Sequence, residues 1–373
     1  MSLKTIKSAI TRNLINIPGW CTKRKIVVIE SDDWGSIRMP SMDVYNSFLE
    51  KGYKVDQSNY NRLDSLESND DLIALYDVLS RYKDKFGNPP TLTANSVVAN
   101  PNFNKIKKSG FANYYYEHVK DTLQQYPRHD KVFDLWHEGI ANKVFYPQFH
   151  GREHLNIIRW ISALNKNNKD VMYTFNHNTT FSGIEDYNFM EAYDQDSYDE
   201  ISTHKATIAD GLKIFKETFG YSSKSFIAPC YTWSSDLDKT LFDHGVQYFQ
   251  GSIFQMIPKG GFNNYKKKYH FLGQKNAYGQ RYLSRNCIFE PSLIKKNNSV
   301  DYTLDSIAIA FRLNKPAIIS SHRINYIGYL DESNRTNNLI LLNTLLKNII
   351  LKWPDVEFMT SDKLGDLIDY DIK

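Results

Sequence analysis

Short apolar runs rich in β-branched and aromatic residues alternate along this chain with segments that repeat apolar residues at helical spacing. Runs of the first kind predict strands, and strands that alternate with helices predict parallel pairing through crossover helices. Several runs, such as KIVVIES and PAIISSH, stay apolar until a polar cluster at the carboxyl end, as buried parallel strands do. The expected strands cover residues 25–31, 91–99, 144–149, 171–175, 225–230, 246–252, 287–291, 317–321 and 356–360.

This alternation runs through the whole chain without a linker rich in Pro, Gly or Ser and without a fixed repeat. We therefore expect one α/β domain over residues 1–373, built as a distorted (β/α) barrel of seven or so parallel strands. A helical extension is expected at residues 1–24, and helical insertions at 42–90 and 102–140. In such a barrel the active site lies at the carboxyl ends of the strands, so polar residues there are the candidates for chemistry.

Charge and cysteine content narrow the classes of function. The 46 Lys and Arg nearly balance the 42 Asp and Glu, with a net charge of +4 and no long basic block, so nothing favours a nucleic-acid partner. Cys21, Cys230 and Cys287 are widely separated, which predicts neither a disulfide framework nor a zinc ribbon and fits a reducing compartment.

The first 24 residues lack an apolar run of signal-peptide length, and no stretch of 18 apolar residues occurs. We therefore expect a cytoplasmic protein without a transmembrane segment. Ile6, Ile10, Leu14 and Ile15 with interspersed Lys and Arg predict an amphipathic helix. Packing on the domain is the favoured interpretation, and a peripheral position on a membrane surface is the alternative.

The first candidate cluster is Glu30-Ser31-Asp32-Asp33-Trp34-Gly35, at the end of the first strand. Adjacent carboxylates repel each other, so a positive partner such as a metal compensates them, or one of them is neutral. Neighbouring side chains at a strand end diverge, so one Asp could bind a metal while the other accepts a proton. An ordinary turn or helix cap is the common alternative for such a pair.

The second cluster is His150-Gly151-Arg152-Glu153-His154, which follows the strand at 144–149. We expect it to open a helix that carries Leu155, Ile158 and Ile161. In a first helical turn, a three-residue gap lets both imidazoles face one point, as paired metal ligands do. Two ordinary surface histidines are the alternative.

Two further clusters also follow strands. His322, after the strand at 317–321, is placed for proton transfer, although a structural histidine is common at such a position. Pro229 ends another strand and leaves backbone N–H groups free at a turn, where that of Cys230 could hold a developing oxyanion.

The order of these clusters resembles the polysaccharide deacetylases, also called the NodB homology domain or carbohydrate esterase family four. Their Thr-Phe-Asp-Asp-Gly, His-x-x-x-His and Leu-x-His motifs resemble the segments at 30–35, 150–154 and 320–322, and the resemblance covers residues 25 to about 367. It implies a divalent metal, zinc first with cobalt or nickel as alternatives, bound by Asp33, His150 and His154. It also implies that Asp32 is the base and His322 the acid in removal of an acetyl group from an N-acetylated sugar or glycan precursor.

The sequence departs from the family at the Arg-x-Pro-Tyr motif, which here is Ile227-Ala228-Pro229-Cys230. The arginine that orients the catalytic aspartate is therefore missing from its place, and Arg152, Arg285 and Arg323 remain open as substitutes. A catalytically inactive carbohydrate-binding barrel and a hydrolase of a non-sugar amide or an O-acetyl ester are the alternatives. The side chains expected to line a sugar pocket are Trp34, Tyr231, Trp233, Asn95, His177, Glu290, Arg323 and Asn325.

Overall fold

The protein is described by a computed structural model that covers residues 10–183, 188–294 and 299–372. Its centre is a curled nine-stranded sheet in the order β10-β7-β6-β5-β2-β1-β12-β11, with β13 also paired to β1, and every pair is parallel. The end strands β10 and β11 do not pair with each other among the described residues, so the barrel is open on that side. The predicted distorted (β/α) barrel is confirmed. In chain order its strands are β1 (Ile26–Trp34), β2 (Leu92–Ser96), β5 (Phe145–Phe149), β6 (Ser225–Phe226), β7 (Tyr248–Gly251), β10 (Arg281–Ser284), β11 (Cys287–Ile288), β12 (Ala317–His322) and β13 (Glu357–Met359).

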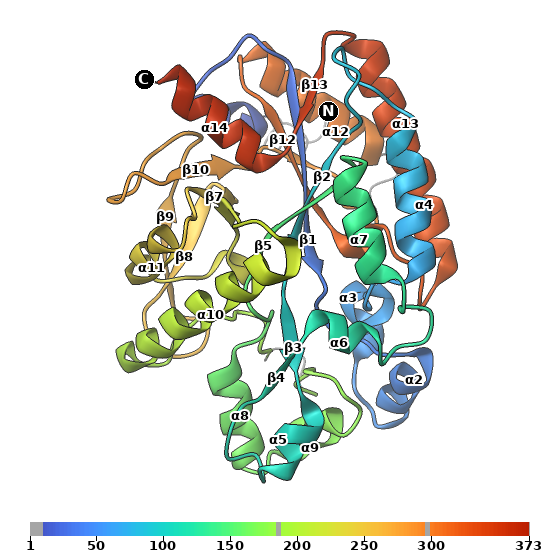
Figure 1. Ribbon diagram of the computed structural model, residues 1–373, viewed down its shortest axis with the longest axis vertical. Helices are drawn as coiled ribbons and strands as arrows, with labels where there is room; N and C mark the ends of the chain where they lie inside the picture. Colours follow the sequence, from blue (N-terminus) through green and yellow to red (C-terminus); the bar gives the residue numbers. More distant parts are fainter. Residues whose placement is uncertain (1–9, 184–187, 295–298, 373) are drawn as a thin grey trace.

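Strand β1 lies in the middle of the sheet, and all nine of its residues are buried. Its unbroken apolar start is explained by this position, because helices cover a parallel sheet on its outer face. Helices α4 (Asn69–Ser80), α7 (Val132–Ala141) and α13 (Glu332–Lys352) lie side by side along it, and α10 (Ile201–Phe219) packs on β5 (Figure 1). One large apolar core between these helices and the sheet holds the strand ends in place.

The expected helical insertions are present, with short strands among them. Residues 42–90 contain α2 (Met42–Glu50), η1 (Val55–Gln57), α3 (Asn59–Leu63) and α4; residues 102–140 contain α5 (Phe103–Lys108), β4 (Tyr116–His118), α6 (Val119–Leu123) and α7. Strand β4 pairs with β3 (Ala99–Pro101) outside the main sheet. Helices α2, α5, α8 (Ile157–Asn165) and α9 (Lys169–Phe175) gather at the end of the molecule toward which β1 runs (Figure 1).

One predicted strand is wrong. Residues 171–175 lie in helix α9, where Val171 and Phe175 are one helical turn apart and both are buried in a small apolar cluster with Trp160. The Asn168 side chain accepts hydrogen bonds from the first backbone N–H groups of this helix. A five-residue apolar run fits either period, and here the cap and the one-sided burial favour the helix.

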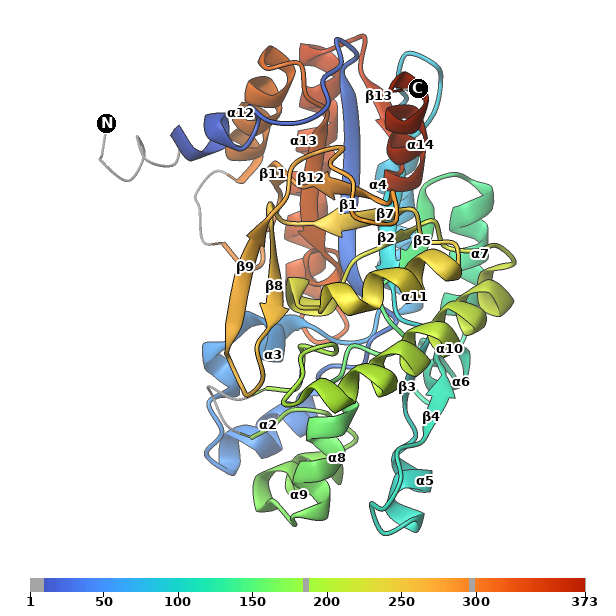
Figure 2. The same ribbon diagram turned by 90° about the vertical axis from the view of Figure 1, so that its left-hand side faces the viewer.

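Three strand regions escaped the sequence analysis. They are β4, β10 and the hairpin of β8 (Phe254–Pro258) and β9 (Tyr265–Tyr269). The hairpin carries Lys266, Lys267 and Lys268 on β9, and four of that strand's five residues are exposed, so no apolar run marks it. In Figure 2 the hairpin stands on the same side of the molecule as the N-terminal segment.

The described part of the N-terminal extension packs on the domain. A helical turn over residues 10–14 places the Arg12 guanidinium 4.6 Å from the centre of the Tyr302 ring, and Arg12 donates a hydrogen bond to Ser306 (3.3 Å). Ile10 and Leu14 are exposed, and Ile6 lies outside the described residues. None of the helices in the described ranges has the length and apolar character that a membrane span requires.

Candidate active site

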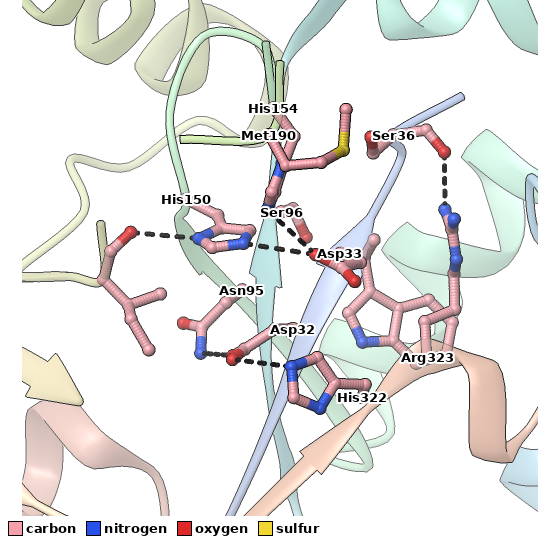
Figure 3. Close-up of polar contacts among 12 residues, drawn as sticks. Asp32, Asp33, Ser36, Asn95, Ser96, His150, His154, Met190, His322 and Arg323 are labelled. Carbon is pink, nitrogen blue, oxygen red and sulfur yellow. Dashed lines mark hydrogen bonds and ion pairs between the residues drawn. The ribbon is translucent and has the colours of Figure 1, made fainter. Parts of the chain in front are cut away.

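Asp32 and Asp33 lie at the carboxyl end of β1, where the backbone breaks the strand pattern. Pairing with β2 shifts register between Ser31 and Trp34, and Asp33 has a φ of 79°, in the left-handed region. Asparagine and aspartate adopt this conformation more readily than most residues. As a result, the two adjacent carboxylates face different partners instead of each other (Figure 3).

Asp33 meets both predicted histidines. Its Oδ1 lies 3.4 Å from Nε2 of His150 and 3.3 Å from Nε2 of His154, and all three side chains are buried. One ligand atom from each residue fits within 4.8 Å of the others. One carboxylate and two imidazoles are a common donor set for a divalent metal with an open coordination position.

The protonation states suit metal binding. His150 Nδ1 lies 2.9 Å from the carbonyl oxygen of Ile227 and donates a hydrogen bond to it, which turns Nε2 toward Asp33. Burial lowers the pKa of His154 well below its ordinary value, more than the nearby Asp33 raises it, so His154 is neutral. Burial would raise the pKa of Asp33, but Arg38 and His154 hold it well below its ordinary value, so Asp33 is ionised.

A buried ring nitrogen without a partner fits a cation at this place. Nε2 of His150 lies 3.4 Å from Asp33 Oδ1 and has no hydrogen-bond partner among the described residues. A buried polar atom of this kind is costly unless a ligand completes its bonds. A divalent metal held by Asp33, His150 and His154 would do so, and the residues therefore fit a metal.

The two histidines do not open a helix, as the spacing had suggested. Residues 151–156 form a loop, and α8 begins only at Ile157. Gly151 has a φ of 117° and allows the sharp turn directly after β5. The imidazoles converge through this loop, with ring centres 4.9 Å apart.

Asp32 is bound by Arg285, one of the three arginines that the sequence left open as its partner. Arg285 follows β10 and donates to both oxygens of Asp32, from Nη1 to Oδ2 (2.7 Å) and from Nη2 to Oδ1 (2.6 Å). Its Nε donates to Glu30 (2.5 Å), and Asn95 donates to Asp32 Oδ1 (2.7 Å). Burial opposes ionisation of Asp32, but Arg285 outweighs it and lowers the pKa of Asp32 to about 2.

The other two candidate arginines serve different carboxylates. Arg323 is fully buried and binds Asp64 and Glu67 at distances of 2.9–3.2 Å. Arg152 binds Glu153 (2.6 Å) and Asp210 (2.9 Å). Arg285 therefore occupies the position beside Asp32 that Arg152 and Arg323 do not reach.

His322 lies opposite Asp32 because β12 pairs with β1 in that register. Its Nε2 is 3.7 Å from Asp32 Oδ2, and its Nδ1 is 2.6 Å from Glu290, which in turn accepts a hydrogen bond from Asn325 (2.6 Å). Burial would lower the pKa of His322, but Glu290 outweighs it and raises the pKa to about 9. His322 is therefore an imidazolium at neutral pH.

These groups line one cavity of about 360 Å³. It is lined by the site residues Asp32, Asp33, His150, His154 and His322. Its other lining residues come from the segments 38–39, 58–61, 179–182, 188–190 and 228–231. The wall residues are Arg38, Met39, Ser58, Tyr60, Asn61, Thr179, Thr180, Phe181, Ser182, Asn188, Met190, Ala228, Cys230 and Tyr231. The volume falls in the range of pockets for small ligands or single sugar units.

Of the predicted sugar-binding side chains, only Tyr231 lines the cavity. Trp34 and Trp233 are core residues, 0% and 4% exposed, so their rings have no free face for a pyranose; Trp233 stacks on Phe249 with ring centres 5.6 Å apart. Both are therefore left out of the substrate site. The remaining polar candidates are partners of other side chains or backbone, as Glu290 is of His322 and Asn95 of Asp32. Arg323 and Asn325 are likewise buried, and His177 is half-buried.

Cys230 lies at the cavity wall in a tight turn. Both Cys230 (φ 54°) and Tyr231 (φ 57°) have left-handed backbone conformations directly after Pro229. Both residues line the same cavity as Asp32 and Asp33. A role of the Cys230 N–H as an oxyanion donor stays a prediction.

Arg38 and Tyr60 are cavity residues that the sequence analysis missed. Neither lies at the end of an expected strand. Arg38 forms ion pairs with Asp33, which precedes it closely in the chain, and with Asp64, which lies well beyond it. The one available signal was the short distance in sequence between Arg38 and the Asp32-Asp33 pair.

Comparison with protein-family models finds no match, and comparison with curated proteins finds none either. Among solved structures, a probable polysaccharide deacetylase from Pseudomonas aeruginosa PAO1 is 10% identical with a TM-score of 0.45, covering 92% of this chain and 91% of that one. The Puue allantoinase is 10% identical (TM-score 0.43), with 93% and 91% covered. A 4-alpha-glucanotransferase from Thermococcus litoralis is 9% identical (TM-score 0.44), with 91% of this chain covered and 40% of that one. We base the functional proposal on the geometry of the site and not on these similarities.

Proposed function

We propose that this protein is a metal-dependent hydrolase that removes an acetyl group from an N-acetylated sugar or glycan precursor. The observation that carries the proposal is the buried group Asp33, His150 and His154 next to an ionised Asp32 and a protonated His322 in one cavity. A metal ligand set, a base and an acid are the parts that hydrolysis of an amide requires.

Asp33, His150 and His154 would hold the metal, zinc first among the candidates. When bound, a divalent ion of this kind polarises a carbonyl group and acidifies water. The hydrogen bond from His150 to the Ile227 carbonyl keeps the imidazole in the orientation that a ligand needs.

Asp32 is proposed as the base. Arg285 and Asn95 hold its carboxylate by hydrogen bonds. Its Oδ2 lies 3.7 Å from His322 Nε2 at the edge of the cavity, where a water molecule could donate a proton to it. The same arginine makes Asp32 a weak base, with a pKa of about 2, so it accepts a proton only from a strongly acidified water. Arg285 is a positioning residue in this scheme, since it acts through Asp32.

His322 is proposed as the acid. The Glu290 carboxylate accepts a hydrogen bond from Nδ1–H and keeps the ring charged, so Nε2 presents a proton toward the cavity. A departing amine needs this proton, because an amide anion is a very poor leaving group.

Two alternatives share parts of this site. A hydrolase of a non-sugar amide or an O-acetyl ester would use the same groups, so only substrate profiling separates it from the proposal. The main reason to consider an inactive carbohydrate-binding barrel was the missing motif arginine. Arg285 donates to Asp32 as that arginine would, so this reason no longer favours the alternative.

The first test is the metal content of wild type and of the His150→Ala/His154→Ala variant, followed by assays of acetate release from a panel of N-acetylated sugars. His137→Ala/His244→Ala is the matched control, since neither residue lines the cavity. We expect about one metal ion per wild-type and control chain, loss in the site variant, and acetate release that follows metal content. A wild type that binds neither zinc, cobalt nor nickel after reconstitution would contradict the proposal.

A further inference from the structure

Arg38 is the one guanidinium of the cavity wall whose hydrogen-bonding capacity is largely unused. A guanidinium has five N–H donors. Among the described residues, the only hydrogen bond that Arg38 makes goes to the sulfur of Met190, a weak acceptor, and its buried Nε has no hydrogen-bond partner. By contrast, the Nε and both Nη atoms of Arg285 and of Arg323 all donate to oxygen.

The ion pairs of Arg38 are loose and shared. Nη2 lies 3.3 Å from Asp33 Oδ2, and Nε lies 3.3 Å from Asp64 Oδ2. Asp64 also accepts two hydrogen bonds from Arg323, and Asp33 belongs to the ligand group for the metal. Both carboxylates therefore have other partners besides Arg38. The Arg38 side chain itself is only 14% exposed.

A buried cation with unused donors is costly unless a ligand completes its bonds. Arg38 lines the same cavity as the metal group and the acid, so a substrate that reaches them also reaches Arg38. A carboxylate matches the planar fork of a guanidinium and adds a single negative charge. The nearby Tyr60 ring, 5.9 Å from the guanidinium carbon, limits the directions from which a ligand can approach it.

We propose that Arg38 binds a carboxylate of the substrate, and that the cavity therefore selects acidic N-acetylated sugars over neutral ones. This inference rests on the proposed function for the position of the acetyl group. It assigns Arg38 a role in substrate choice, separate from the metal group and from the acid and base.

The test is equilibrium binding, measured by ligand-observed NMR titration of the zinc-reconstituted protein at pH 7. Three probes are compared. N-acetylglucosamine carries no carboxylate, its C6-oxidised acid carries one at C6, and N-acetylmuramic acid carries one on the substituent at C3. We expect at least one acid to bind about tenfold to a hundredfold more tightly than the neutral sugar, as loss of charged hydrogen bonds implies. Arg38→Gln should abolish this difference, so that the acids and the neutral sugar bind the variant within about threefold of each other.

Arg62→Gln is the matched control, because Arg62 is exposed and lies one residue from the wall residue Asn61. If Arg38→Gln fails to fold, Arg38→Lys replaces it in the test. This variant keeps the positive charge but not the planar guanidinium, so it should retain part of the preference for the acidic sugars. Equal binding of all three probes to wild type, or a preference that survives in Arg38→Gln, would overturn the inference. Acetate release is measured separately: selective binding without hydrolysis of any probe would defeat the proposed function alone, whereas hydrolysis without selectivity would defeat only the role of Arg38.

Discussion

Replacing Arg285 by Met tests the electrostatic design of the site most directly. Arg285 is 6% exposed and bonds two buried carboxylates, Glu30 and Asp32. Removing it leaves both without their cation, and breaking a buried pair in this way costs about 3–5 kcal/mol. We therefore expect Arg285→Met to unfold at markedly lower urea concentration than wild type at pH 7.

The pH dependence should change sign. In wild type, the folded-state pKa of Asp32 is about 2 against an ordinary value of 3.8, so the folded state binds protons less readily than the unfolded state. This group contributes about 2 kcal/mol above pH 4 that is lost as the pH falls toward 2. Without Arg285, burial raises the pKa of Asp32 above its ordinary value, so the folded variant binds protons more readily and gains stability as the pH falls from 7 to 5.

Urea unfolding at pH 5, 6 and 7 measures this effect. Arg281→Met, on β10 just before Arg285, is the matched control. Its carboxylate partner Asp369 is about one-third exposed, so water can solvate this carboxylate when Arg281 is lost. Its loss of stability should be small and nearly independent of pH. The double variant Asp32→Asn/Arg285→Met should recover part of the lost stability, because it removes one unpaired charge. If Arg285→Met is equally destabilised at pH 5 and pH 7, and the double variant recovers nothing, the electrostatic explanation is refuted.

Three further outcomes are expected. Asp32→Asn should retain wild-type metal content by elemental analysis while acetate release falls about a hundredfold to ten-thousandfold, and parallel loss of the metal would remove Asp32 from the role of base. Because the protonated His322, with a pKa of about 9, is the proposed acid, kcat should fall as the pH rises through 9, and Glu290→Gln should move this limb to lower pH in a pH–rate profile. His204 is buried with no hydrogen-bond partner for either ring nitrogen among the described residues, and burial lowers its pKa to about 4. The folded protein should therefore lose about 3 kcal/mol between pH 6.5 and pH 4, and urea unfolding of His204→Phe should show a shallower loss over this range.

Much of the sheet was predictable because buried parallel strands produce unbroken apolar runs. Strand β1 is the clearest case, and the polar residues at its end proved to face the cavity. Strand β9 was not predictable, since its three lysines and exposed surface lack any apolar pattern. Residues 171–175 were misassigned because five residues are too few to separate a strand period from a helical one.

The candidate site was predictable where the residues of one function are close in sequence or recur at a known spacing. His150 and His154 meet Asp33 as expected, even though a loop rather than a helix brings them together. Of the aromatic candidates, Tyr231 lines the cavity, whereas Trp34 and Trp233 are buried in the core. Arg285 could not be chosen from sequence, since it reaches Asp32 from 253 residues away through the pairing of strands.

The pairing of β1 with β12 has a consequence for how this architecture could diversify. Asp32 and His322 face each other because backbone hydrogen bonds of two central strands set their register. Residues 58–61, 179–182 and 188–190 also line the cavity but lie outside the sheet. Insertions, deletions or replacement in those segments would leave the spacing of Asp32 and His322 unchanged. The segments that contact a substrate and the pair Asp32–His322 could therefore change independently in evolution. A new substrate range could be acquired by exchange of those segments while Asp32 and His322 keep their positions.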